Sequence, residues 1–189
     1  MRKSWYVILL VILVTTSIMN VGFAQTNYTG WFKKAAEPYK GSTVYLVSSN
    51  TLYVRGIKEQ IPEFEKMTGI KVVLDTFGEN IADQKIATEL AGATGAYDAI
   101  WAISPKYYQY AKLKWVTSLD SFMKNSKITN NKILNKGDFI KSLYDAGEID
   151  NKIYAIPNFA ATTMLFYRKD IFEKLGIKGP PETIDDKTA

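Results

Sequence analysis

The stretch TVYLVSSNTLYVRGIKEQIPEFEKMTGIKVVLDTF, residues 43–77, carries the hydrophobic patterns that decide the fold. Its first and last parts, residues 43–48 and 70–77, are rich in β-branched and apolar residues and each predict a buried strand. Between them, apolar residues recur at helical spacing from Ile57 onward, and the pattern stops before Gly69. The stretch therefore predicts a strand–helix–strand unit.

The same alternation continues along the chain. An apolar stripe at helical spacing over residues 82–90 predicts a second helix, and YDAIWAIS at 97–104 predicts a third strand. Pro105 opens a third helical pattern. Strands that alternate with helices of these lengths indicate an α/β fold with a parallel sheet covered by helices on both faces. In such sheets, ligands bind outside the carboxyl ends of the strands.

The remaining third of the chain is more irregular. Residues 139–147 predict a short helix, and Asp150-Asn151 predicts a turn before another strand. The apolar run 162–167 predicts a strand, followed by a small helix that ends at Gly176. A new helix start at Thr183, near the end of the sequence, leads us to expect a longer protein.

Composition excludes several functions. The 189 residues include neither His nor Cys, which excludes thiol nucleophiles, Ser-His triads and Cys/His zinc sites within the sequence. The 19 acidic residues leave carboxylate chemistry open. The formal charge is +5, but the lysines are dispersed rather than clustered, so the sequence does not predict nucleic-acid binding. No glycine-rich nucleotide motif is present, and we expect no cofactor.

Residues 1–24 have the pattern of a signal peptide. Arg2 and Lys3 precede an apolar run at 5–14, and Ala24 offers a small residue for cleavage. We therefore expect an exported, periplasmic protein. An uncleaved membrane anchor is the alternative. Without a cysteine, the chain cannot be held as an acylated lipoprotein.

Several segments together resemble a known family. They resemble the sugar-binding branch of the extracellular solute-binding proteins of bacterial ABC transporters. The segments are GSTVYLVSS from Gly41, YDAIW from Tyr97, and YAIP at 154–157 followed by FYRKDIFEKLGIKGPPET at 166–183. The resemblance extends from about Gly41 to Asp186. The motif GEN before QKIATELA is similar to the polyol-binding subgroup.

This resemblance implies a two-lobe fold like that of periplasmic binding proteins, with parallel sheets flanked by helices. It also implies a monomeric, non-enzymatic receptor that holds a sugar or sugar alcohol between its lobes and delivers it to the permease subunits. The expected organisation follows the chain in order: signal peptide 1–24, lead-in 25–41, first part of lobe 1 at 42–120, connecting segment and hinge approach 121–160, and hinge strand with the start of lobe 2 at 161–189.

Three positions depart from the family pattern. Asn151 stands where a glycine is common, and Ile184 replaces a tryptophan. Ala161 occupies a place where polyol-binding members often carry an acid, which weakens the assignment of a particular sugar.

The candidate ligand-binding residues combine an aromatic face with polar groups, because a sugar presents both C–H faces and hydroxyls. Four of them have a structural alternative: Trp101 as an ordinary core residue, and Asn50, Glu79 and Asn80 as helix-capping residues. The full set is Asn50, Glu79, Asn80, Trp101, Phe159 and Thr162.

Two other functions remain open at this stage. A receptor of the same fold for a polyamine or ferric ion is one, although the absence of His disfavours a ferric site. A secreted carbohydrate-active enzyme is the other. Its acid–base pair would have to come from neighbouring acids such as Glu63 and Glu65, which in helical segments are usually solvated.

Overall fold

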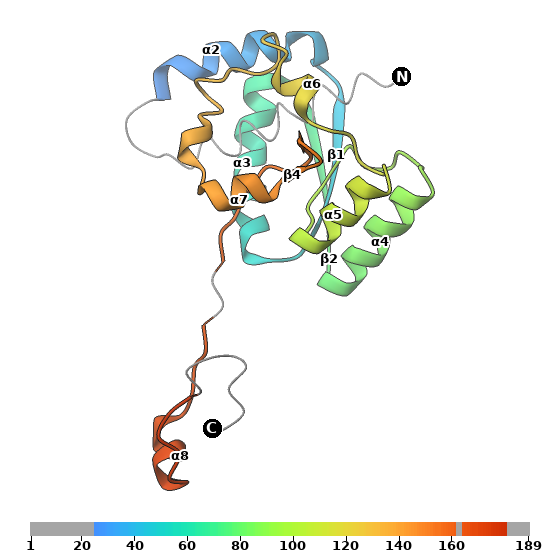
Figure 1. The fold of residues 1–189 in the computed structure, drawn as a ribbon. Coiled ribbons are helices and arrows are strands. Elements are labelled where there is room, and N and C mark those ends of the chain that lie inside the picture. The colour runs from blue at the N-terminus through green and yellow to red at the C-terminus, as the bar shows by residue number, and fades with distance from the viewer. Residues whose placement is uncertain (1–24, 162–163, 181–189) are drawn as a thin grey trace. The chain divides into compact units, whose positions relative to one another are not determined.

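The fold comes from a computed structural model that describes residues 25–161 and 164–180. The chain divides into two compact units, Met1–Phe159 and Ala160–Ala189, so the boundary lies between Phe159 and Ala160. Figure 1 shows their elements. The expected signal peptide and the helix start at Thr183 lie outside the described residues.

A parallel sheet of three strands lies at the centre of the first unit. Strands β1 (Thr43–Ser49), β2 (Lys71–Phe77) and β3 (Ala99–Ile100) are arranged in the order β2-β1-β3. Both neighbours run parallel to β1, with Ser49 opposite Phe77 and Val47 opposite Ile100. The predicted parallel sheet is confirmed. The third strand is much shorter than predicted, because the chain leaves the sheet after Ile100 to enter the next helix.

Helices cover both faces of this sheet, as predicted. Helix α3 (Leu52–Thr68) lies on one side of it in Figure 1, and helices α4 (Glu79–Ala91) and α5 (Ser104–Lys112) lie on the other. Successive strand residues point to opposite faces. Val44 accordingly belongs to one buried cluster, and Val47 belongs to a second cluster with Ile86 and Tyr110.

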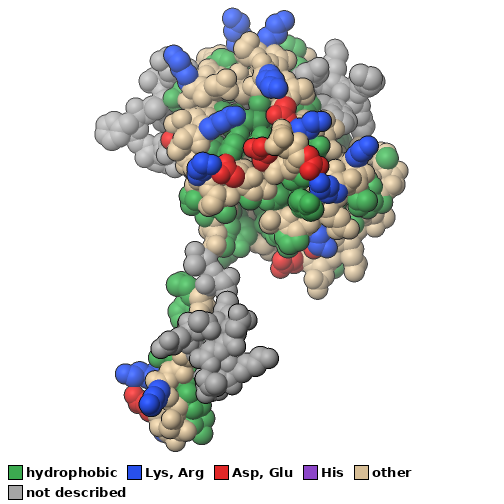
Figure 2. All heavy atoms as spheres, in the orientation of Figure 1, with side chains coloured by type: hydrophobic (Ala, Val, Ile, Leu, Met, Phe, Trp, Pro, Cys, Tyr) green, Lys and Arg blue, Asp and Glu red, His purple; other side chains and the backbone are tan. Residues whose placement is uncertain are grey.

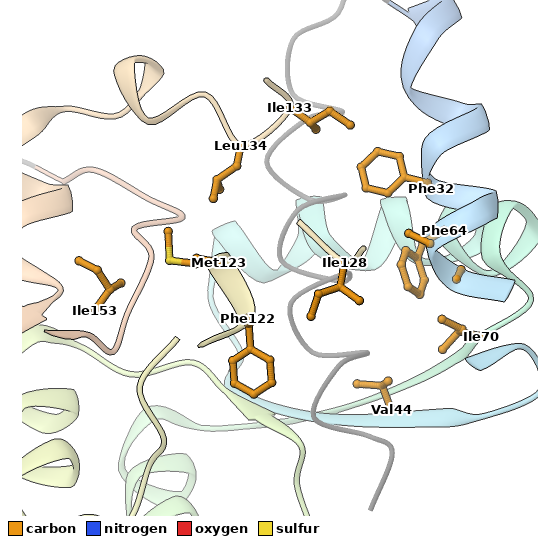
Figure 3. Close-up of a cluster of buried hydrophobic side chains, with 12 residues drawn as sticks. Phe32, Val44, Phe64, Ile70, Phe122, Met123, Ile128, Ile133, Leu134 and Ile153 are labelled. Carbon is orange, nitrogen blue, oxygen red and sulfur yellow. The ribbon is translucent and has the colours of Figure 1, made fainter. Parts of the chain in front are cut away.

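The lead-in is more ordered than its sequence indicates. It forms helix α2 (Gln25–Ala36) and the 3-10 helix η1 (Glu37–Tyr39). Phe32, Ala35 and Ala36 are buried against the larger cluster, where Phe32 lies near Phe64 and Ile128 (Figure 3). Tyr28, Trp31, Phe32, Ala35 and Ala36 recur at helical spacing and pack on this cluster, a period that sequence reasoning missed.

The segment after the sheet returns to the same core. It contains α6 (Asp120–Met123), η2 (Lys136–Asp138), α7 (Lys141–Ala146), β4 (Glu148–Ile149) and β5 (Lys152–Ile153).

Strands β4 and β5 form an antiparallel hairpin, and the turn between them is the predicted one. Asp150 and Asn151 have φ of 50° and 59°, a left-handed conformation that Asp and Asn tolerate better than most residues.

The second unit contains helix α8 (Lys169–Lys174), followed by Gly176 with φ of 70°. The predicted small helix is confirmed. The predicted strand at 162–167 is wrong for the described part of that run, because residues 164–167 have no regular secondary structure. A strand requires a neighbour for its backbone groups, and no described strand pairs with this segment.

Candidate functional site

The carboxyl ends of the three parallel strands bring the sequence-predicted polar residues together. The backbone N–H of Asn50, just after β1, donates a hydrogen bond of 2.7 Å to the carbonyl of Phe77, the last residue of β2. The backbone N–H of Trp101, just after β3, donates one of 2.9 Å to Val47 of β1. Neighbouring strands lie about 4.8 Å apart, so this edge spans roughly 10 Å. That width matches a small ligand.

The capping alternative is wrong for the two asparagines at this edge. The N-cap of α3 is Thr51 and the N-cap of α4 is Gly78, and neither helix start has a side-chain cap hydrogen bond. The side chains of Asn50 and Asn80 are exposed instead. Glu79 is also exposed, in the first turn of α4, where a negative charge is favoured by the helix dipole. All three side chains are therefore free to meet a solute.

Trp101 is not an ordinary core residue. It is half-buried, belongs to neither buried cluster, and stacks on Tyr53 with ring centroids 6.3 Å apart and planes inclined by 30°. Tyr53 also contacts Phe159, at 3.6 Å between centroids and 32° between planes. The three residues form an aromatic group, which we call the Tyr53 group.

Sequence reasoning missed Tyr53 itself. The available signal was its position three residues after Asn50, in the first turn of the helix that begins at the ligand edge of the sheet. The last candidate, Thr162, lies outside the described residues.

The junction between β1 and α3 also contains unpaired polar groups. Ser49 Oγ and Thr51 Oγ1 are buried and have no hydrogen-bond partner within the described residues. Each such group costs about 1–3 kcal/mol. Such groups are rare in native proteins, and each calls for a physical explanation such as an ordered water or a functional role.

A cavity of about 630 Å³ lies beside β3 in the first unit. Trp101 forms part of its wall, but most of its lining is apolar, including Val47, Ile100, Val116 and Ile156. A polyhydroxylated solute needs hydrogen-bonding partners for each buried hydroxyl. The polar strand edge therefore suits such a solute better than this cavity does.

A polar network holds the loop between α4 and β3. The Tyr97 hydroxyl donates a hydrogen bond of 2.8 Å to Asp75 Oδ2 on β2. Burial, together with this bond to Asp75, raises the pKa of Tyr97 to about 12. Lys85 lies 5.7 Å from the centre of the Tyr97 ring and pairs with Glu89. A hydrogen bond from Thr94 lowers the pKa of Glu89. The side chains of this network bind one another, so we assign them a structural role in holding the loop.

One of the acids considered for catalysis has a structural partner in the fold. Glu65 Oε1 accepts a hydrogen bond of 2.8 Å from the backbone N–H of Val72, which gives this acid a structural partner.

The described ranges contain no cluster of acidic, His or Cys side chains able to hold a metal ion. On the face shown in Figure 2, Lys and Arg side chains are spread among other types rather than gathered in one stripe. Within the same ranges, no helix has the length and apolar character needed to cross a membrane.

Comparison with known proteins identifies the family. The profile of the bacterial extracellular solute-binding protein family matches residues 48–189. The chain belongs to this family, as its sequence segments predict.

A relative of known function and two solved structures resemble the chain. The erythritol/L-threitol-binding protein of Mycolicibacterium smegmatis is 28% identical over 155 residues, covering 77% of this chain and 32% of the relative. An ABC transporter solute-binding protein from Agrobacterium vitis, solved with bound D-mannitol, is 28% identical with a TM-score of 0.59, covering 74% of this chain and 32% of that one. An ABC transporter solute-binding protein from Agrobacterium radiobacter, solved in complex with ribitol, shares the fold. It is 20% identical with a TM-score of 0.57, covering 75% of this chain and 35% of that one. The chain thus spans about a third of the length of these proteins.

Proposed function

We propose that this chain is the N-terminal part of the extracytoplasmic substrate-binding component of an ABC importer. It captures a sugar or sugar alcohol between two lobes and delivers it to the membrane permease subunits. The first unit supplies lobe 1, and the segment after Phe159 leads into lobe 2. The protein acts as a monomer and without a cofactor.

The observation that carries this proposal is the strand edge of the first unit. Asn50 and Asn80 offer amide donors and acceptors there, Glu79 offers a carboxylate acceptor, and Trp101 offers an aromatic face. These are the groups that a polyhydroxylated carbon chain needs, because its hydroxyls must be paired and its C–H groups pack on rings. Phe159 completes the proposed contacts within the first unit, and Thr162 remains a candidate contact outside the described residues.

Sugar alcohols are the favoured ligand class. The family relative at 28% identity binds erythritol and L-threitol, and the similar structure at the same identity holds D-mannitol. A polyamine or ferric ion is less suited to this edge, where Glu79 is the one acid among the candidate contacts. A hydrolytic role is disfavoured because Glu65 already has a backbone partner.

Titration of the full-length protein tests the ligand class. D-mannitol, erythritol, ribitol, glucose, maltose, spermidine and ferric citrate are titrated in turn by calorimetry, and the mixtures are then analysed for products. We expect micromolar or tighter binding of at least one sugar alcohol, which corresponds to about 8 kcal/mol or more. The recovered ligand should be intact. Binding of spermidine or iron alone, or cleavage of a maltose bond, would contradict the proposal.

Mass measurement tests the expected export. We propose that residues 1–24 are removed and that the mature protein is periplasmic. The exported protein should therefore begin at or near Gln25. A mature chain that retains Met1 would instead favour a membrane anchor.

A further inference from the structure

Tyr53 is the ring that Trp101 and Phe159 share. The centroid of the Tyr53 ring lies 6.3 Å from that of Trp101 and 3.6 Å from that of Phe159. Trp101 lies on the segment after β3, and Phe159 lies on the segment after Pro157. Both segments lack regular secondary structure. The backbone N–H of Trp101 is hydrogen-bonded to Val47 of β1, so Phe159 is the ring whose backbone is held less firmly.

Tyr53 lies on a regular helix, whereas its two partners lie on segments without regular secondary structure. It lies in the first turn of α3, a helix of 17 residues. The next residue, Val54, is 1% exposed, and Phe64 in the same helix is 3% exposed. Side chains that must hold a set geometry are placed most accurately by helices and strands. Tyr53 therefore connects a rigid element to two rings on irregular segments.

We propose that Tyr53 is a positioning residue for the ligand, holding the rings of Trp101 and Phe159 in the orientation in which they contact the carbon chain of a sugar alcohol. This inference rests on the proposed function, because it assigns Trp101 and Phe159 to the ligand. Phe159 is 44% exposed, so its ring is available to a solute as well as to Tyr53. Trp101 lies directly beyond β3, at the edge where the polar candidates gather.

Loss of the Tyr53 ring removes a packing partner from each of the other two rings. A ligand then has to order both side chains as it binds, which lowers affinity without removing any polar contact. A change that keeps the ring and removes only the hydroxyl retains the support. The comparison of Tyr53→Phe with Tyr53→Ala thus separates ring positioning from hydrogen bonding by the phenol.

Calorimetric titration with D-mannitol, erythritol and ribitol tests the proposal in the full-length protein. For whichever polyol the wild type binds, we expect Tyr53→Ala to weaken affinity about tenfold or more and Tyr53→Phe to stay within about threefold. Tyr108→Ala is the matched control, because Tyr108 is exposed and lies on α5. It should bind within about twofold of wild type. Circular dichroism and thermal melting check folding, and Tyr53→Leu, which retains apolar bulk, replaces Tyr53→Ala if the latter does not fold.

A double-variant cycle distinguishes positioning from independent contact. If Tyr53 acts through Phe159, then Tyr53→Ala combined with Phe159→Ala weakens binding little more than the stronger single change. A loss equal to the product of the two single losses would overturn the proposal, as would polyol binding by Tyr53→Ala within about twofold of wild type. Failure of the wild type to bind any of the three polyols would overturn the sugar-alcohol assignment of the proposed function and this inference with it.

Discussion

The hydroxyl of Tyr97 donates a hydrogen bond of 2.8 Å to Oδ2 of Asp75. Asp75 lies on β2 and Tyr97 lies just before β3, so the bond joins the two strands that flank β1. It fixes the loop that enters β3, and Trp101 follows directly after that strand. A structural contact remote from any ligand thus helps to place the aromatic face of the candidate site.

Alkaline pH should weaken this contact in a predictable window. The pKa of Tyr97 is raised to about 12 in the folded protein, against about 10 in an unfolded chain. Between these values the unfolded state loses the proton while the folded state keeps it, so the free energy of unfolding falls as pH rises. The contribution is fully present below about pH 10 and is lost as pH rises through about 12.

Urea unfolding of wild type and Tyr97→Phe at pH 8 and pH 11.5 measures this effect. We expect Tyr97→Phe to be less stable by about 1 kcal/mol at pH 8 and the difference to shrink at the higher pH. Comparison with wild type cancels the titration of lysines elsewhere. An equal difference at both values would show that Tyr97 does not titrate as its surroundings indicate.

Asp98 should set the position of β3 beside β1. Its backbone N–H donates a hydrogen bond of 2.8 Å to Tyr45, and its Oδ2 accepts one of 3.0 Å from the Tyr45 N–H. Asp98→Ala removes the acceptor, and we expect a loss of about 1–2 kcal/mol in the free energy of unfolding. Asp98→Asn retains a side-chain acceptor and should lose less than half of that amount. Denaturant unfolding of the two variants gives the values, and equal losses would show that only the charge matters.

Trp101 should matter more for ligand binding than Tyr108. Trp101 lies at the strand edge and stacks in the Tyr53 group, whereas Tyr108 is exposed on α5 near Lys112. In the full-length protein we expect Trp101→Ala to weaken polyol binding about tenfold or more and Tyr108→Ala to leave it within about twofold. Calorimetry gives both affinities, with circular dichroism to check folding. Equal affinities would assign Trp101 to structure alone.

The strand and helix order was predictable because the hydrophobic periods of the first unit are strong. Val44 and Val47 anchor opposite faces of β1, and Ala82 and Ile86 form the buried stripe of α4. The short β3 was not predictable in length, because composition does not show where pairing with β1 stops. Helix α2 was missed although Trp31, Phe32, Ala35 and Ala36 recur at helical spacing, because that stripe lies among polar residues.

The site was predictable only in part, for a related reason. The carboxyl ends of parallel strands share an edge, so the order of strands in the sequence is enough to place Asn50, Glu79 and Trp101 together. Tyr53 was not singled out, because its importance comes from tertiary contact with Phe159, more than 100 positions away in the chain. No local pattern encodes such a contact.

Residues 25–189 by themselves should bind polyols only weakly. The relatives are about three times as long as the aligned part, and the proposed ligand lies between two lobes. With one lobe alone, many ligand hydroxyls remain in water and lobe closure adds nothing to affinity. Loss of three or four good contacts, at about 1.4 kcal/mol for each factor of ten, would move micromolar binding beyond detection.

Parallel titrations of residues 25–189 and the full-length protein with D-mannitol and the other polyols measure the difference. We expect at least a hundredfold weaker binding by the shorter chain, or about 2.7 kcal/mol. Met164, Leu165 and Phe166 are 66%, 71% and 83% exposed, so the shorter chain must first be shown to be monomeric by analytical ultracentrifugation. Equal affinities would place the whole site inside the first unit, with Asn50, Glu79 and the Tyr53 group as its complete set of contacts.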